Sequence, residues 1–334
     1  MREMTQADTP VRLAILGAGH IGARHAACAQ QIAEAEVVAV WSRTPRHAVA
    51  LAERVGARTC ETLQEVADAP DVDAAIVCTP NAFHAESAVA MARGGKHVIC
   101  EKPLARTLAQ AEEIIEAADD AGVQLLVAHV VRFFPAFRRL HDLIQGGAVG
   151  QPAVIRMTRE TGPTLTGWRT DVAVSGGALL EMGVHDFDWL LWACGRAQRV
   201  YCRAISQGGH SAPDYALTTV RLWSGAIAHI ESSMVSLTGS RTHGEIAGDA
   251  GLLTYDSDQD TALRVQLRDS QAATGVHLPT TYTVESPYVT QLRHFCRCIR
   301  GQEEALITPQ EALGALRVGL AALESAESGQ AVSL

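Results

Sequence analysis

The first 128 residues of this chain repeat one pattern, a short apolar run followed by a longer stretch of helical composition. The apolar runs are residues 11–16, 37–41, 73–78, 96–100 and 123–128. Short apolar runs separated by helices of about 10–15 residues indicate βαβ units, whose strands pair in parallel. We therefore expect an N-terminal α/β domain over residues 1–128, a doubly wound parallel sheet of the Rossmann type.

The rhythm changes after residue 128. A glycine-rich entry leads into a strongly apolar helix within residues 172–194, and residues 199–284 read as four or five strands. Turn signals rather than helices separate these strands, which favours antiparallel pairing. The end is helical again, and Thr308-Pro309-Gln310-Glu311 carries the start signal of a helix. We therefore expect an α+β domain over residues 129–334.

Charge and composition limit the partners and the compartment. The chain has 28 basic and 37 acidic residues, a net charge of −9, whereas nucleic acids and anionic membranes attract a positive face. No apolar run reaches the ~18 residues of a membrane span, and the polar leader lacks a signal-peptide core. Eight scattered cysteines without a CxxC are typical of reduced thiols. We expect a cytoplasmic protein that binds neither nucleic acid nor membrane.

A glycine-rich loop follows the first predicted strand and opens a predicted helix. In such a loop the first glycine allows a tight turn, the second lets the backbone approach a diphosphate, and the third lets helix and strand pack closely. The amides at the helix start then face the phosphates. We expect this loop to bind a nicotinamide dinucleotide through Gly17, Gly19, His20, Ile21 and Gly22.

The end of the second predicted strand bears on the choice between NAD and NADP. An acidic residue usually accepts both ribose hydroxyls there, but this chain has Ser42 and Arg43. A serine and an arginine suit a 2′-phosphate, which favours NADP over NAD. Two alternatives stay open for Arg43, stacking on the adenine or pointing into solvent as a surface charge.

Lys102 stands at the end of the fourth predicted strand, within Glu101-Lys102-Pro103. Ligands of such sheets bind outside the carboxyl ends of the strands, and Pro103 restricts Lys102 to an extended backbone. A lysine at that place can bind a substrate hydroxyl and the nicotinamide ribose, and can stabilise a developing alkoxide. The alternative is a surface lysine beside a turn.

A second chemical segment runs from Gly176 to Asp188. If it is helical, Glu181, His185 and Asp188 share one face. A carboxylate beside His185 would raise the pKa of the ring and orient it, which suits an acceptor or donor of the alcohol proton. The alternative is a hydrogen-bonded helix histidine. Glu181 and His185 also have the spacing of two metal ligands, but no third ligand stands nearby, so we expect no metal.

These motifs together resemble the Gfo/Idh/MocA oxidoreductases. The resemblance rests on residues 17–22, on Thr79-Pro80-Asn81 with His84, on residues 101–103 and on residues 176–185. It continues through Arg132 and residues 146–150, and it reaches the end of the chain in Thr308, Ser325 and Gly329. It implies further cofactor-binding residues, namely Thr79, Pro80, Asn81, His84, Glu101 and Lys102.

The resemblance implies a Rossmann domain and a second domain built on a large, mostly antiparallel sheet. It also implies that the open face of this sheet makes the subunit contacts of a homodimer or homotetramer. It implies hydride transfer between NAD(P) and a hydroxyl-bearing carbon of a sugar, cyclitol or related polyol. Lys102 matches the family's lysine and His185 matches its acid/base. Glu181 replaces an aspartate and is one methylene longer, so it either binds substrate differently or only orients His185.

Three further side chains are candidates for contact with the substrate. Trp168 offers an aromatic platform for a sugar face, and Arg169 offers a fork for a carboxylate or phosphate; a packed tryptophan beside a surface arginine is the alternative. Arg132 follows the fifth predicted strand and should face the same crevice as Glu181 and His185.

Two other functions stay open. The chain could bind a dinucleotide and a sugar as a non-catalytic regulator, although the presence of both Lys102 and His185 favours an enzyme. Within enzymes, the same groups would also serve a trans-dihydrodiol dehydrogenase or a ketone reductase.

Overall fold

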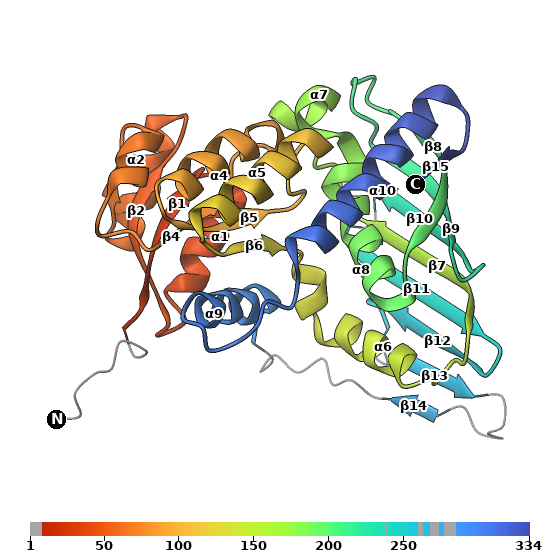
Figure 1. Cartoon of the computed structure of the whole chain (residues 1–334). Helices are drawn as coiled ribbons and strands as arrows, with labels where there is room; N and C mark the ends of the chain where they lie inside the picture. Colours follow the sequence, from red (N-terminus) through yellow and green to blue (C-terminus); the bar gives the residue numbers. More distant parts are fainter. Residues whose placement is uncertain (1–8, 238, 260–262, 268–273, 277–284) are drawn as a thin grey trace. The chain divides into compact units, whose positions relative to one another are not determined.

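The computed structural model describes residues 9–237, 239–259, 263–267, 274–276 and 285–334 (Figure 1). Most of the leader lies outside these residues. The contacts divide the chain into two units: unit 1 is Met1–Val130 with Glu285–Leu313, and unit 2 is Val131–Val284 with Gly314–Leu334. Sequence reasoning expected one division after residue 128. The structure differs because a late segment returns to the first unit.

Unit 1 is built on a six-stranded sheet whose paired strands are all parallel. The strand order is β3-β2-β1-β4-β5-β6. Because the order reverses between β1 and β4, ligands of such a sheet bind outside the carboxyl ends of these strands. The predicted doubly wound fold is confirmed. The strands are β1 (Val11–Leu16), β2 (Ala35–Trp41), β3 (Arg58–Thr59), β4 (Ala74–Val77), β5 (His97–Glu101) and β6 (Leu125–Ala128).

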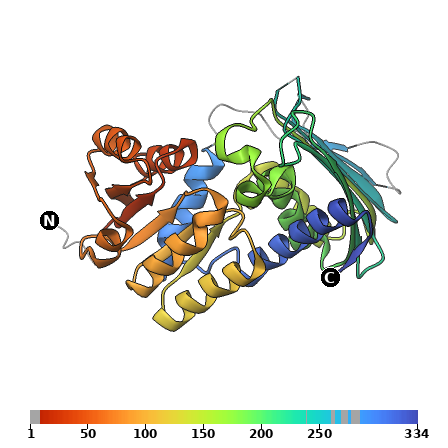
Figure 2. The ribbon, with the colours of Figure 1, turned by 90° about the horizontal axis from the view of Figure 1, so that it is seen from above.

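Helices lie on both faces of this sheet, α4 beside α5 on one face and α1 beside α9 on the other (Figure 2). Local signals set their ends: the Thr107 hydroxyl accepts from the amide of Gln110 at the start of α5, and Gly122 ends α5 in the left-handed conformation. The helices of unit 1 are α1 (His20–Ala29), α2 (Pro45–Val55), α3 (Leu63–Asp68), η2 (Asn81–Phe83), α4 (His84–Arg93), α5 (Leu108–Ala121) and α9 (Pro287–Ile299).

Charged side chains of α9 and of Arg300, the residue directly after it, explain why Glu285–Leu313 belongs to unit 1. Arg293 and Arg297 both form ion pairs with Glu34, at 3.4 and 3.3 Å. Arg300 donates to the carbonyl of Pro10 at 2.8 Å. The late segment is therefore bound to the loop that precedes β2 and to the start of β1.

Unit 2 is built on a nine-stranded sheet with the order β14-β13-β12-β11-β7-β10-β9-β8-β15. All pairs are antiparallel except β7 with β10, so the expected mostly antiparallel sheet is confirmed. The strands are β7 (Pro152–Glu160), β8 (Ala197–Ile205), β9 (Tyr215–Leu222), β10 (Ile227–Ser233), β11 (Arg241–Gly248), β12 (Gly251–Asp256), β13 (Leu263–Leu267), β14 (Thr274–Val276) and β15 (Val332–Ser333).

The structure has more strands in this region than the four or five expected within residues 199–284. Seven of the described strands, β8 to β14, lie there. Two of them are only five and three residues long, too short for an alternating pattern to stand out. Residues 277–284, the end of the expected strand region, lie outside the described part of the chain.

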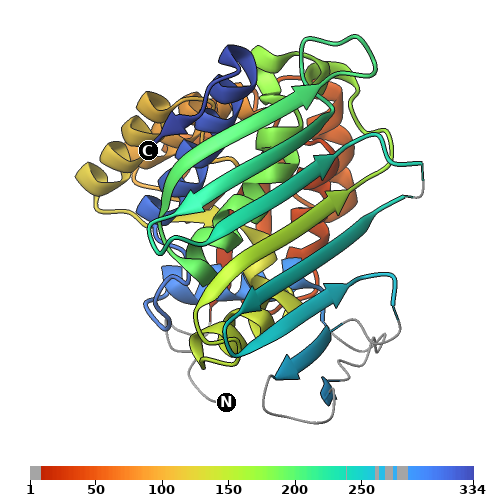
Figure 3. The same ribbon diagram turned by 90° about the vertical axis from the view of Figure 1, so that its right-hand side faces the viewer.

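One face of this sheet packs on helices, and no helix of the described residues covers the other, which we call the open face (Figure 3). Along β9, Ala216, Thr218, Val220 and Leu222 are buried while Leu217 is exposed. None of the described helices has the length and apolar character needed to cross a bilayer. The remaining helices are η3 (Val130–Phe133), α6 (Pro135–Gln145), η4 (Gly167–Thr170), α7 (Val172–Ser175), η5 (Leu179–Gly183), α8 (Val184–Cys194) and α10 (Pro309–Ser328).

Candidate functional site

The glycine loop between β1 and α1, with the first turn of α1, contains three glycines. Two of them have no room for a side chain, and the other faces free space. A Cβ on Gly17 would lie 2.6 Å from the carbonyl oxygen of Cys78, and its φ is +105°. A Cβ on Gly22 would lie 2.0 Å from the carbonyl oxygen of Gly17. At Gly19, by contrast, a Cβ would meet no described atom within 4 Å. The backbone is therefore open to a ligand at the second glycine, where a diphosphate would approach.

The end of β4 adds a polar group beside this loop. The Oγ1 atom of Thr79 is buried and has no hydrogen-bond partner within the described ranges. A Cβ on Gly17 would lie 2.9 Å from the Thr79 amide nitrogen, so the two backbones are in close contact. Pro80 and the buried Asn81 follow at the start of η2. A buried hydroxyl that lacks a protein partner suits a polar ligand, so this edge of the sheet fits the expected dinucleotide.

Ser42 and Arg43 follow the end of β2, as expected. The guanidinium carbon of Arg43 lies 3.7 Å from the centroid of the Phe83 ring, and the amide of Thr44 lies 3.4 Å from the Ser42 hydroxyl. This cation–π contact restricts the long arginine side chain. Sequence reasoning missed Phe83, because no local pattern connects η2 to the end of β2.

Lys102 directly follows β5, and its backbone amide is held by Glu101. One carboxylate oxygen of Glu101 accepts from that amide at 3.1 Å, and the other lies 2.8 Å from His25 Nε2. Burial raises the pKa of the Glu101 carboxyl, but the hydrogen bond from His25 and the nearby charges of His25 and Lys102 outweigh burial and hold that pKa below its ordinary value. Glu101 is therefore an anion that binds the backbone amide of Lys102.

His25 is the residue of this cluster that sequence reasoning missed. It lies on α1, three residues after the last glycine of the loop, and it is 1 % exposed. The available signal was a histidine inside an alanine-rich helix that packs on a sheet, since a buried polar side chain needs a polar partner.

His84 connects the turn after β4 to the turn after β5. Its ring is buried, with Nδ1 2.8 Å from the carbonyl oxygen of Pro103 and Nε2 2.8 Å from that of Thr79. Carbonyl oxygens only accept hydrogen bonds, so the ring donates to a carbonyl through whichever nitrogen carries a proton, and a neutral ring has one such nitrogen. The expectation for His84 was a contact with the cofactor. The structure instead shows the ring holding two backbone turns of the fold.

In unit 2, the segment before His185 is not the continuous α-helix that the spacing suggested. Leu179–Gly183 forms the π-helix η5, and α8 begins at Val184. Glu181 Oε2 accepts from Arg169 Nε at 2.9 Å, and the Arg169 guanidinium carbon lies 4.9 Å from the Trp168 ring centroid. The structure thus brings together Trp168, Arg169 and Glu181, three of the predicted substrate-binding residues.

His185 is partly exposed in the first turn of α8, whereas both neighbouring aspartates are buried. The Asp186 carboxylate binds Arg159 with both oxygens, at 2.7 and 2.9 Å. Asp188 binds Arg132 in the same way, at 2.7 and 2.9 Å. Arg132 was expected to face substrate, but its guanidinium is 1 % exposed and occupied by this pair. The reason is that a buried guanidinium needs a buried anion.

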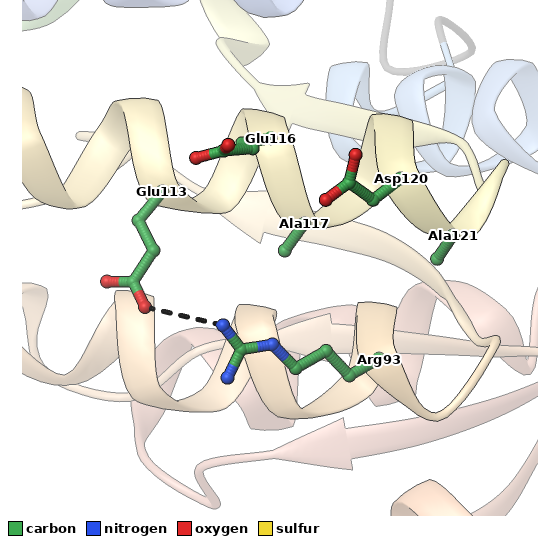
Figure 4. Close-up of a pocket in the computed structure, with 6 residues that line it drawn as sticks. All are labelled: Arg93, Glu113, Glu116, Ala117, Asp120 and Ala121. Atoms are coloured by element: carbon green, nitrogen blue, oxygen red, sulfur yellow. Dashed lines mark ion pairs between the residues drawn. The ribbon is translucent and has the colours of Figure 1, made fainter.

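Neither a metal-binding cluster nor the hollow on the surface of unit 1 coincides with the expected site within the described residues. The described residues contain no group of three or more histidine, cysteine or acidic side chains that could hold a metal ion. A hollow of about 420 Å³ lies between α4 and α5, where Arg93 forms an ion pair with Glu113 at 3.9 Å (Figure 4). It is lined by Arg93 at the end of α4 and by α5 side chains from Glu113 to the end of that helix. Helices in this fold run opposite to the strands, so the hollow is far from the carboxyl ends where ligands bind.

Comparisons with known proteins agree with this arrangement. Residues 11–129 match the oxidoreductase family with an NAD-binding Rossmann fold, and residues 137–254 match the GFO/IDH/MocA C-terminal domain. The 1,5-anhydro-D-fructose reductase of Ensifer adhaerens is 31% identical, over 97% of this chain and 98% of its own. The myo-inositol 2-dehydrogenase of Thermotoga maritima is 29% identical, over 97% and 98%.

A solved structure extends the likeness to the whole chain. GenD2 from gentamicin A biosynthesis, crystallised in complex with NAD, has a TM-score of 0.88 and 25% identity, covering 100% of this chain and 99% of its own. Together with the matches of both domains, this shows that the chain belongs to the GFO/IDH/MocA family of NAD(P)-dependent oxidoreductases.

Proposed function

We propose that this enzyme transfers a hydride between NAD(P) and a hydroxyl-bearing carbon of a sugar, cyclitol or related polyol. Relatives over the full length are named as a myo-inositol 2-dehydrogenase and an anhydrofructose reductase. The observation that carries the proposal is the turn after β5. There Lys102 follows a buried carboxylate, at the carboxyl edge of the sheet that also carries the open glycine position.

The chain's own residues would bind the cofactor and move the proton. The amides at the start of α1 and the backbone at Gly19 would hold the diphosphate. The nicotinamide, when bound, supplies or accepts the hydride. Lys102 would donate a hydrogen bond to the reacting oxygen and stabilise negative charge on it. His185 would take the hydroxyl proton during oxidation and return it during reduction.

The cluster of Trp168, Arg169 and Glu181 would contact the substrate. Because Arg169 is bonded to Glu181 at 2.9 Å, neither group carries an uncompensated charge. A neutral, hydroxyl-rich molecule suits this cluster better than a carboxylate or phosphate, since hydroxyls can bond to both members without breaking the pair. Glu181 is accordingly a substrate-binding residue in this proposal rather than the partner of His185.

Two substitutions test the proposed chemistry. Lys102→Met and His185→Ala should each lower kcat by about two to four orders of magnitude, the usual contribution of a positioned acid or base. Suitable probes are myo-inositol with NAD+ or NADP+, and 1,5-anhydro-D-fructose with NADH or NADPH. Lys96→Met is the matched control, because Lys96 donates to the carbonyl of Ala69 at 2.6 Å and has no role in the proposal.

Near-normal turnover in both Lys102→Met and His185→Ala would refute the assignment. Dinucleotide binding without turnover, across a wider panel of cyclitols, pyranoses and keto sugars, would favour the non-catalytic regulator instead.

We also propose that the enzyme prefers NADP over NAD. Arg43 and Ser42 follow β2, the place where a 2′-phosphate would lie. The Phe83 ring supports the guanidinium at 3.7 Å, so the arginine loses little conformational entropy when it binds an anion.

A second copy of this chain is the proposed partner of the open sheet face. A sheet face that packs on no helix and carries several large exposed apolar side chains is suited to association with another protein surface. The face carries exposed apolar side chains on β8, on β9, on the turn after it and at the start of β10, and Trp223 is 60% exposed. They are Tyr201, Ile205, Leu217, Trp223 and Ile227.

A further inference from the structure

Lys102 is preceded by a carboxylate that points into unit 1. Glu101 is 6 % exposed, and its two oxygens serve two different elements. Oε2 accepts from the backbone amide of Lys102 at 3.1 Å, and Oε1 lies 2.8 Å from Nε2 of His25 on α1. One buried carboxylate therefore bridges the lysine turn and the helix that follows the glycine loop.

The pairing with His25 makes this buried anion tolerable. A carboxylate inside a protein loses its hydration, and removing the partner of such a charge is strongly destabilising. The carboxylate accepts, so His25 donates through Nε2–H. The other ring nitrogen of His25 has no partner among the residues described. The bond to Glu101 is therefore the polar contact that fixes the ring.

α1 in turn is fixed relative to the glycine loop. A Cβ on Gly22 would collide with the Gly17 carbonyl at 2.0 Å, so the helix start is pressed against the loop. His25 lies one turn further along the same helix, and its ring meets the Tyr288 ring edge-on, with centroids 6.3 Å apart. The position of Glu101 is thus set by the element that would hold the diphosphate.

We propose that His25 is a positioning residue for Lys102 and acts through Glu101. The inference rests on the proposed role of Lys102 and adds a second residue to it. His25 does not touch substrate in this scheme. It keeps the Glu101 carboxylate beneath the Lys102 backbone, and it places the lysine at a constant distance from the glycine loop.

A matched pair of substitutions tests this. His25→Gln keeps an amide N–H within reach of Glu101, whereas His25→Asn has the same amide on a chain one methylene shorter. His25→Asn should lower kcat about tenfold to a hundredfold, because a displacement of 1 Å at a reacting group can cost about 10²-fold. His25→Gln should recover most of that loss. The Kd for NADPH, measured by nicotinamide fluorescence, should change less than about threefold in both, since backbone amides hold the diphosphate.

The chemical reactivity of the Lys102 amine can be measured directly, because the chain has few lysines. The chain has two, Lys96 and Lys102. Trace acetylation of the protein without cofactor, followed by mass spectrometry of the two peptides, gives the reactivity of Lys102 relative to Lys96. His25→Asn should change this ratio at least about threefold, and His25→Gln should leave it close to wild type. Cys28→Ala, another buried position on α1, controls for a general loss of stability and should leave the ratio unchanged.

A double-mutant cycle separates this inference from the proposed function. If His25 acts through Lys102, His25→Asn should cost nothing further in a Lys102→Met background. Full additivity of the two losses, or an unchanged acetylation ratio in His25→Asn, would overturn the positioning role. Near-normal kcat in both Lys102→Met and His185→Ala would instead refute the proposed function. If His25→Asn fails to fold, Glu101→Gln carries the same ratio measurement and the same cycle.

Discussion

At the residue scale, Arg43 is the position where one side chain decides between two cofactors. Its guanidinium lies on the Phe83 ring at 3.7 Å. A charge-assisted hydrogen bond contributes about 1.5–3 kcal/mol, so Arg43→Ala should weaken NADPH binding by about tenfold to a hundredfold. NADH binding should change less than about threefold, because NADH has no 2′-phosphate. Titration of nicotinamide fluorescence with both cofactors measures the ratio.

Phe83→Leu provides the companion measurement. Loss of the aromatic face should give a smaller effect of the same sign, about twofold to fivefold for NADPH, because cation–π support is worth roughly 0.5–1 kcal/mol at exposed sites. Equal weakening of NADH and NADPH in Arg43→Ala would show that Arg43 supports the adenine rather than a phosphate.

At the scale of elements, the pair of Arg132 and Asp188 joins η3 to α8. Both side chains are 1 % exposed. Asp188→Ala should reduce the free energy of unfolding by about 3–5 kcal/mol, since it leaves a buried cation without a partner. The double substitution Arg132→Met with Asp188→Leu should recover most of the lost free energy of unfolding. Urea denaturation measures both.

The exposed pair of Arg156 and Glu245 on neighbouring strands β7 and β11 is the control for that prediction. Arg156→Ala should cost less than about 1 kcal/mol, because solvent screens such a pair. A similar cost for the exposed and the buried pair would contradict the burial argument.

How far the sequence could predict these elements depended on how local their signals are. Helices were predicted between the apolar runs of the first 128 residues, and α4 (His84–Arg93) and α5 (Leu108–Ala121) lie on either side of the run at residues 96–100. The start of α10 was also predicted. Thr308 and Glu311 exchange hydrogen bonds there, at 2.8 and 3.2 Å, because a capping box depends on residues three apart. The π-helix η5 was not predicted, since its spacing of polar residues also fits an α-helix.

The candidate site shows the same limit. Sequence reasoning identified the glycine loop and Lys102 from short motifs, and the role of Lys102 remains a prediction. The pairs around them were not identified, because His25 and Glu101 are 76 residues apart and Arg132 and Asp188 are 56 apart. Such contacts depend on which helix faces which strand end, and apolar periodicity alone does not determine this.

At the scale of the whole molecule, the open face of the second sheet predicts self-association. Leu217 is 45% exposed and lies on β9, the third strand from one edge of this sheet. A glutamate there would bury unpaired charges in the proposed interface, at a cost of several kcal/mol. Leu217→Glu should therefore lower the oligomer mass to that of a monomer in light scattering coupled to size exclusion.

Leu237→Glu is the control, because Leu237 is 97% exposed and lies outside the strands of the sheet. It should leave the mass unchanged. A wild-type protein that elutes as a monomer at micromolar concentration, or an oligomer that survives Leu217→Glu, would exclude this face as the interface.

The return of Glu285–Leu313 to unit 1 has a consequence for the order of events during synthesis. A ribosome makes β1 to β6 first. The arginines of α9 that bind Glu34, and Arg300 directly after α9, which binds the carbonyl of Pro10, are made more than 150 residues after β6, roughly ten seconds or more later at common elongation rates. Until then α1 has its contacts with α2 but lacks those with α9. The nucleotide-binding unit is thus begun first and finished late. We therefore expect stable dinucleotide binding only after translation has passed α9. A nascent chain that stops before α9 should leave the surface of α1 that α9 covers exposed to chaperones and proteases.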